Sequence, residues 1–148
     1  MIEAAVEVLI VEDNPQDLEL TLRALRRSHL ANNIVTVGDG EEALDFLFAR
    51  GRYAGRNGGE VPKVVFLDLK LPKVDGFEVL RVMRSDPRTK NVPVVVITSS
   101  AEERDRMATY DIGANSYVVK PIEFDSFTKT MSDVGFYWLA INRGPAEA

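Results

Sequence analysis

Residues 64–76 read VVFLDLKLPKVDG: four apolar residues, an aspartate, and a turn-forming stretch that ends in glycine. A short apolar run without polar alternation predicts a β-strand that is covered on both faces. Further apolar runs rich in β-branched residues occur at Val6–Val11, Ile34–Val37, Val92–Ile97 and Ser116–Val119. Strands of this kind are typical of a parallel sheet that lies between two layers of helices.

The segments between these runs show helical spacing of their apolar residues. The first, Pro15–Ser28, places Leu18, Leu22 and Leu25 on one face and follows Asn14, a good N-cap residue. Helices are also expected at Glu41–Arg50, Phe77–Arg84, Glu102–Ile112 and Glu123–Asn142. The sequence therefore predicts an α/β fold: a doubly wound, five-stranded parallel sheet with right-handed crossovers and an extended C-terminal helix.

Length and composition fit one globular domain. The chain has 148 residues, 45% of them hydrophobic and 28% charged, and we expect a single domain over 1–148, with a core at about 6–142 and a frayed tail after 143. No apolar run could span a membrane, and the apolar start leads into acidic residues as a first strand would, so we expect a cytoplasmic protein. The net charge of −5 argues against nucleic-acid binding. Without cysteine, and with His29 as the single histidine, thiolate and histidine-cluster metal sites are excluded.

Charged and hydroxyl side chains follow four of the predicted strands. Glu12 and Asp13 come after the first, Asp68 after the third, Thr98 after the fourth and Lys120 after the fifth. Because the carboxyl ends of parallel strands lie at one edge of the sheet, these residues should converge there. Any one of them alone would fit a solvated loop, but the whole set at strand ends indicates a site.

This set of side chains points to phosphoryl chemistry. Three ionised carboxylates repel one another and need a cation, and oxygen ligands with open positions suit Mg²⁺, with Mn²⁺ as an alternative. Lys120 supplies a second positive charge, and Thr98 a hydroxyl donor. A carboxylate placed between a cation and a lysine can attack phosphorus to form an aspartyl phosphate, so Asp68 is the expected nucleophile.

The sequence resembles the receiver domains of two-component response regulators, which share a flavodoxin-like topology. The resemblance runs from Val6 to about Asn142 and rests on four motifs. These are the acidic pair Glu12-Asp13, FLDLKLPKVDG (66–76), VVVITSSA (94–101) and GANSYVVKPI (113–122).

The resemblance implies a role for each site residue. Asp68 is the phosphoacceptor, Asp13 a direct Mg²⁺ ligand, and Glu12 a ligand either directly or through water. The backbone carbonyl of Lys70 completes the protein ligands. Thr98, Tyr117 and Lys120 match the switch pair and the lysine of the family, with a cis bond expected between Lys120 and Pro121.

The switch also has a physical interpretation. A dianionic phosphoryl group on Asp68 offers acceptor oxygens that can draw in the hydroxyl of Thr98. That movement leaves a space into which Tyr117 could rotate from the neighbouring strand. A local change of charge would then alter the surface around the last two helices and the fifth strand.

Other phosphoryl and cofactor chemistries fit less well. A phosphatase of the haloacid-dehalogenase type needs a second aspartate two positions after the nucleophile, where this chain has Lys70. A flavodoxin-like cofactor binder needs a glycine- and hydroxyl-rich loop where this chain has EDNPQD (12–17), and the P-loop motif is absent. The expected function is a stand-alone response regulator, not an enzyme, that is phosphorylated by a sensor histidine kinase. An intermediate that passes the group to a histidine phosphotransfer protein is the alternative.

Two segments depart from a minimal receiver. The loop Arg50–Pro62 carries Arg50, Arg52 and Arg56, and we interpret it as a solvated loop, with kinase docking as the alternative. The long final helix ends in three aromatics, and both features resemble the small receivers that partner bacterial phytochromes. We expect no effector domain after this helix, so output should pass through protein contacts. The final helix carries an apolar stripe, most of which should cover the sheet, at Phe124, Phe127, Met131, Val134, Trp138 and Ile141. Beyond Val134 the apolar character continues at Phe136, Tyr137, Trp138, Leu139 and Ile141, which one helix face cannot hide, and this predicts a homodimer through the C-terminal helix.

Overall fold

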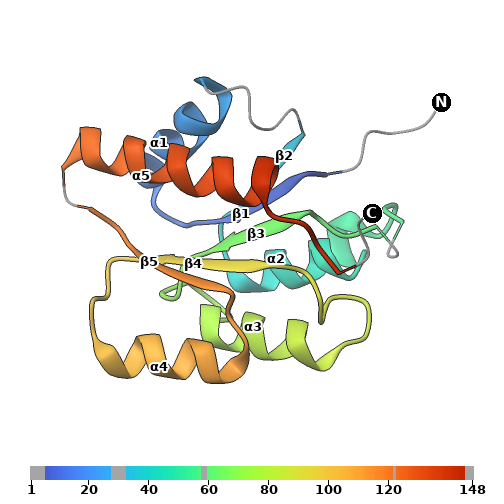
Figure 1. Ribbon diagram of the computed structural model, residues 1–148. Coiled ribbons are helices and arrows are strands. Elements are labelled where there is room, and N and C mark those ends of the chain that lie inside the picture. The colour runs from blue at the N-terminus through green and yellow to red at the C-terminus, as the bar shows by residue number, and fades with distance from the viewer. Residues whose placement is uncertain (1–5, 28–32, 58–59, 122, 146–148) are drawn as a thin grey trace.

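The computed structural model describes residues 6–27, 33–57, 60–121 and 123–145. Within these ranges the chain alternates strands and helices as predicted (Figure 1). The strands are β1 (Val8–Val11), β2 (Ile34–Val37), β3 (Val64–Leu67), β4 (Val94–Thr98) and β5 (Ser116–Val119). The helices are α1 (Pro15–Arg27), α2 (Gly40–Leu47), α3 (Gly76–Ser85), α4 (Glu103–Ile112) and α5 (Phe124–Phe136). His29 and the predicted end of the first helix at Ser28 lie outside the described residues.

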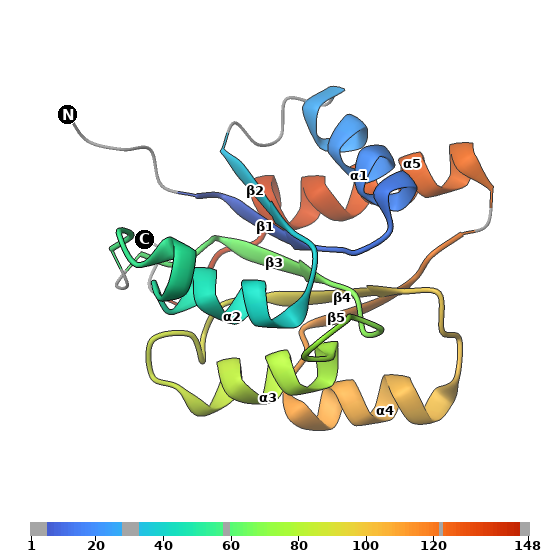
Figure 2. The same ribbon diagram turned by 180° about the vertical axis from the view of Figure 1, so that it is seen from behind.

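The strands form one parallel sheet in the order β2-β1-β3-β4-β5. Helices α1 and α5 cover one face, and α2, α3 and α4 cover the other, as both views show (Figures 1 and 2). The chain winds outward from β1 in one direction to β2 and in the other to β3, so the switch of direction falls beside β1 and β3. The predicted doubly wound α/β fold is confirmed.

Two hydrophobic cores lie on the two faces of the sheet. Along β1, Leu9 and Val11 face the core under α2 and α3, whereas Val8 and Ile10 face the core under α1 and α5. Every residue of β1, β3 and β4 is buried, which explains why these strands read as unbroken apolar runs. No helix among the described residues is long and apolar enough to cross a membrane.

The second helix ends earlier than predicted. It stops at Leu47 instead of Arg50, and Ala49 adopts a left-handed conformation with φ of 52°. A non-glycine residue in this conformation breaks the helical hydrogen bonding, and no sequence pattern marks it. A 3₁₀ turn, Gly51–Tyr53, follows.

The predicted solvated loop at Arg50–Pro62 packs onto α2 in its described part. The Tyr53 hydroxyl donates to Glu42 at 2.7 Å, and the Arg50 guanidinium donates to Asp45 at 3.0 Å. The Arg56 guanidinium donates to the carbonyl of Phe46 and stacks on the ring of the same residue. The side chains of Arg50 and Arg52 are nevertheless 57% and 73% exposed, as expected of a solvated loop, whereas Tyr53 and Arg56 are half-buried.

The C-terminal helix is not regular to Asn142 as predicted. It ends at Phe136 and continues as a π-helical turn, Tyr137–Ile141, in which the Asn142 amide donates to the Tyr137 carbonyl at 2.6 Å. The wide turn brings Trp138 into the core beside α1, with 8% of its surface exposed. Lys63, just before β3, donates from Nζ to the carbonyl of Leu139 at 2.9 Å and fixes the turn to the sheet.

Candidate functional site

The predicted site residues converge at the carboxyl edge of the sheet. Val11 of β1 lies opposite Leu67 of β3, so the next residues, Glu12 and Asp68, emerge side by side at the switch of winding direction. Thr98 is the last residue of β4, and the Lys120 backbone amide donates to its carbonyl at 2.7 Å. The strand register thus brings together residues that are more than a hundred positions apart in the sequence.

Lys120 is the centre of the site. Its ammonium donates to Glu12 Oε1 at 2.6 Å, to Asp17 Oδ2 at 2.9 Å and to Asp68 Oδ2 at 3.0 Å. Only 9% of the Lys120 side chain is exposed, as are 8% of Glu12 and 11% of Asp68. Burial alone would lower the pKa of Lys120, but the hydrogen bonds that its ammonium donates to Glu12 and Asp17 and the charge of Asp68 outweigh it, and the pKa lies above its usual value. The lysine therefore stays charged.

Three carboxylates form an oxygen cluster beside this ammonium. One oxygen from each of Glu12, Asp13 and Asp68 lies within 4.8 Å of the other two. Glu12 and Asp68 are buried and Asp13 is exposed, so the cluster opens to solvent on the Asp13 side. Oxygen-only donors at a partly open site match what Mg²⁺ and Mn²⁺ require. The residues present fit a divalent cation.

The crowding of negative charge in this cluster affects the pKa of Glu12. Burial raises the pKa of Glu12 from 4.5 to about 7, and the charge of Asp68 adds to the effect. The hydrogen bond from Lys120 acts in the opposite direction without cancelling it. A single ammonium does not neutralise all of the neighbouring carboxylates, so we expect Glu12 to take up a proton near neutral pH when no cation is bound.

This proton should compete with a divalent cation. As pH falls from about 8 to about 6, Glu12 becomes protonated and the affinity for Mg²⁺ should fall, because binding must then release the proton. Isothermal titration with Mg²⁺ across this range measures the effect. In Glu12→Gln the affinity should be weaker at pH 8 and depend less on pH. An equally steep pH dependence in Glu12→Gln would show that another group carries the proton.

The predicted switch residues meet at Ser100 in the loop after β4. The Ser100 amide donates to Thr98 Oγ1 at 3.2 Å, and the Tyr117 hydroxyl donates to the Ser100 carbonyl at 2.9 Å. The Ser100 hydroxyl donates to Asp105 of α4 at 2.6 Å. Thr98 is fully buried, whereas Tyr117 is half-buried. The two residues are therefore connected through the backbone of Ser100, whose side-chain hydroxyl is also bonded to α4.

The loop after β3 approaches Asp68 closely. The Lys70 amide donates to Asp68 Oδ1 at 3.3 Å, while the ligand role of its carbonyl stays a prediction. A Cβ on Gly76 would lie 2.3 Å from the Asp68 carbonyl oxygen, so only glycine fits at the start of α3. The described residues contain no cis peptide bond, so the cis bond expected before Pro121 was wrong. With a trans bond, which the tertiary amide modestly favours, Lys120 already reaches its three carboxylates.

Comparison with known proteins agrees with this geometry. The family model for the response regulator receiver domain matches residues 8–132. The chain belongs to the response regulator receiver family. Receiver domains bind a divalent metal ion, and the acidic cluster of Glu12, Asp13 and Asp68 is compatible with such a site.

Several solved receivers are similar over nearly the whole chain. The cyanobacterial phytochrome response regulator RcpA, solved in its phosphorylated form, is 36% identical, with 97% of this chain and all of that chain covered and a TM-score of 0.88. Rcp1, solved in its Mn²⁺-bound form and known from Synechocystis, is 33% identical over 95% of this chain and 99% of that chain, with a TM-score of 0.88. The bacteriophytochrome response regulator AtBRR is 50% identical over 95% of this chain and all of that chain, with a TM-score of 0.73. The predicted likeness to phytochrome-associated receivers is thus confirmed.

One residue of this receiver site escaped the sequence analysis. Asp17 was read only as part of a helix, yet its carboxylate contacts Lys120. Its position in the first turn of α1 could have pointed to it, because the start of that helix follows closely after β1 and the pair Glu12-Asp13.

Proposed function

We propose that this receiver accepts a phosphoryl group on Asp68 from a sensor histidine kinase and signals by protein contacts. The observation that carries the proposal is the Asp68 carboxylate, which lies in an oxygen cluster with Glu12 and Asp13 and accepts a hydrogen bond from the Lys120 ammonium. In our proposal the protein assists its own phosphorylation and dephosphorylation without acting as an enzyme on other substrates. We propose that it works in the cytoplasm.

The chemistry needs few groups. An Asp68 oxygen forms the new bond to phosphorus while the nitrogen–phosphorus bond of a phosphohistidine breaks, and the electron pair of that bond returns to the imidazole, which takes up a proton. Mg²⁺ or Mn²⁺ at Glu12, Asp13, Asp68 and the Lys70 carbonyl would neutralise charge on the phosphoryl oxygens. Lys120 would hold another of these oxygens, and the Thr98 hydroxyl would turn toward the new group.

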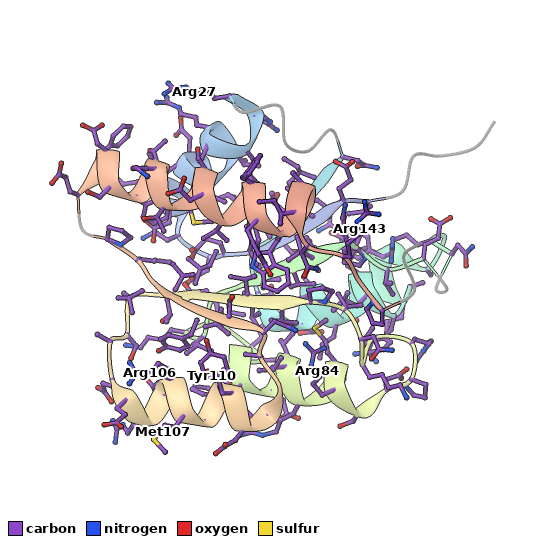
Figure 3. The ribbon with its side chains drawn as sticks, viewed as in Figure 1. Arg27, Arg84, Arg106, Met107, Tyr110 and Arg143 are labelled. Carbon is purple, nitrogen blue, oxygen red and sulfur yellow. The ribbon has the colours of Figure 1, made fainter. Side chains whose placement is uncertain are left out.

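The output surface is proposed from exposed apolar side chains. Met107 and Tyr110 lie along α4 and are 57% and 48% exposed (Figure 3). Val119 of β5 and Phe124 of α5 are 42% and 52% exposed. Apolar side chains gathered on neighbouring elements are typical of protein-binding surfaces. The link from Thr98 through Ser100 to α4 offers a route from the site to this surface.

The kinase partner is proposed to be a phytochrome, since several similar receivers are phytochrome response regulators by name. Mixing the protein with an autophosphorylated bacterial phytochrome kinase and Mg²⁺ should transfer the label within minutes. Transfer no faster than to an unrelated receiver would contradict this partner. Adding a histidine phosphotransfer protein tests the alternative: rapid loss of label to it would indicate a relay intermediate, and retention a terminal switch.

The protein is also proposed to form a homodimer through the end of α5. Phe136, Tyr137 and Ile141 are 53%, 47% and 52% exposed, whereas Trp138 is buried and belongs to the core. Replacing the three exposed residues with serine should convert a dimer to a monomer in light scattering, because it removes most of the apolar contact.

A matched control is Met107→Ser with Tyr110→Ser on α4, which removes comparably exposed apolar side chains elsewhere. This variant should stay dimeric. A wild-type protein that remains monomeric at high concentration, with and without beryllofluoride, would refute the dimer.

A further inference from the structure

Asp17 is a third carboxylate partner of the site lysine and has no role in the chemistry described so far. An ammonium group has three donor hydrogens. Those of Lys120 are taken up by Glu12, Asp17 and Asp68, at 2.6, 2.9 and 3.0 Å. About a quarter of the Asp17 side chain is exposed, so the contact is partly shielded from solvent. It is stronger than an ordinary surface ion pair for that reason.

The beginning of α1 holds Asp17 in place. Asn14 caps the helix, and its Oδ1 accepts hydrogen bonds from the amides of Gln16 at 2.9 Å and Asp17 at 3.1 Å. The Asn14 amide in turn donates to Glu12 Oε2 at 3.2 Å. Thr21 donates from its hydroxyl to the Asp17 carbonyl at 3.0 Å. The carboxylate of Asp17 is therefore fixed relative to Glu12 by a short, capped stretch of chain.

Asp17 differs from Glu12 and Asp68, the other two partners of Lys120, because it has no direct role in the proposed phosphorylation. Glu12 and Asp68 belong to the oxygen cluster that fits a divalent cation, and Asp68 is the proposed phosphoacceptor. Asp17 lies outside that cluster. Of the three carboxylates on Lys120, it alone has no second task, so its bond to the ammonium can persist throughout the reaction.

We propose that Asp17 is a positioning residue that anchors the Lys120 ammonium against the phosphoryl group on Asp68. A lysine side chain has a flexible four-carbon stem, and confining its charge before the reaction lowers the entropic cost of the transition state. The inference rests on the proposed phosphorylation of Asp68. It predicts that Asp17 acts only through Lys120.

A double-mutant cycle tests this with acetyl phosphate as the phosphoryl donor and Mg²⁺ present. Asp17→Ala should lower the labelling rate at saturating donor about tenfold, with little change in the half-saturating donor concentration. In a Lys120→Met background, Asp17→Ala should cause no further loss. An equal further loss in that background, or a wild-type rate in Asp17→Ala, would overturn the inference. Asp17→Asn, which keeps the size of the side chain, serves the same cycle if the alanine variant does not fold.

Two controls separate positioning from charge and from metal binding. Glu19→Gln removes one negative charge from the same helix at an exposed side chain that pairs with Arg23, and it should label at the wild-type rate. Asp17→Ala should bind Mn²⁺ within about twofold of wild type, since Asp17 is outside the oxygen cluster. A loss of Mn²⁺ affinity as large as that of Asp13→Ala would overturn the inference.

An NMR measurement that involves no phosphoryl transfer completes the test. In the Mg²⁺-bound protein the ¹⁵N signal of the Lys120 ammonium should be observable in wild type and broadened by solvent exchange in Asp17→Ala. If this holds but wild type takes no label, the proposed function fails and the anchoring of Lys120 stands. If wild type is labelled and the ammonium signal does not depend on Asp17, the anchoring fails and the proposed function stands.

Discussion

Replacing Asp68 with asparagine should abolish phosphorylation of this protein. The amide lacks the negatively charged oxygen that attacks phosphorus. The other carboxylates that contact Lys120 have different proposed tasks, since Glu12 would bind the cation and Asp17 holds the lysine. The fold should survive, because asparagine has nearly the same size and can still accept the hydrogen bond from the Lys70 amide. Labelling by an autophosphorylated histidine kinase measures the loss, which should be at least a thousandfold, or about 4 kcal/mol in the barrier.

The matched control is Asp125→Asn, which changes an exposed carboxylate in the first turn of α5 that is not part of the oxygen cluster. It should label like wild type. Residual label on Asp68→Asn that is sensitive to hydroxylamine would mean that another carboxylate accepts the group.

Replacing Lys120 with methionine should strongly destabilise the metal-free protein. The ammonium is the shared partner of Glu12, Asp17 and Asp68, two of which are buried, and its loss leaves their charges uncompensated. Removing one partner of a buried ion pair costs about 3–5 kcal/mol, which urea unfolding would detect as a lower midpoint. Mg²⁺ should restore part of the stability, because a cation bound only to the folded state stabilises it by mass action.

Lys129→Met is the control for this substitution. Lys129 pairs with Asp133 on the surface of α5, and 79% of its side chain is exposed. Its loss should leave the free energy of unfolding almost unchanged, because an exposed ion pair contributes little. A Lys120→Met protein as stable as Lys129→Met without metal would show that the carboxylates simply take up protons at no cost.

The strands and the residues at their ends could be predicted from the sequence because both depend on local patterns. Buried strands such as β3 show as apolar runs, and the parallel arrangement then brings Glu12, Asp68 and Lys120 to one edge regardless of their separation. The identities of the converging side chains limited the chemistry further.

What the sequence could not show depends on tertiary contacts. Asp17 contacts Lys120 because the first turn of α1, which Asn14 caps, lies beside the carboxyl edge of the sheet. The end of α2 is set by the left-handed Ala49, a residue type that gives no turn signal. Trp138 is buried by a π-helical turn, where the aromatic run suggested continued exposure on a regular helix. Each of these features follows from packing that a periodic pattern does not encode.

The most direct test of the account is to find where a phosphoryl group attaches to the wild-type protein. After incubation with acetyl phosphate and Mg²⁺, intact mass spectrometry should show one added phosphoryl group that hydroxylamine removes. Reduction with borohydride and peptide mapping should then locate it at Asp68, within the segment that follows β3. A phosphoryl group at any other residue, or no uptake from either acetyl phosphate or a phosphorylated kinase, would contradict the account.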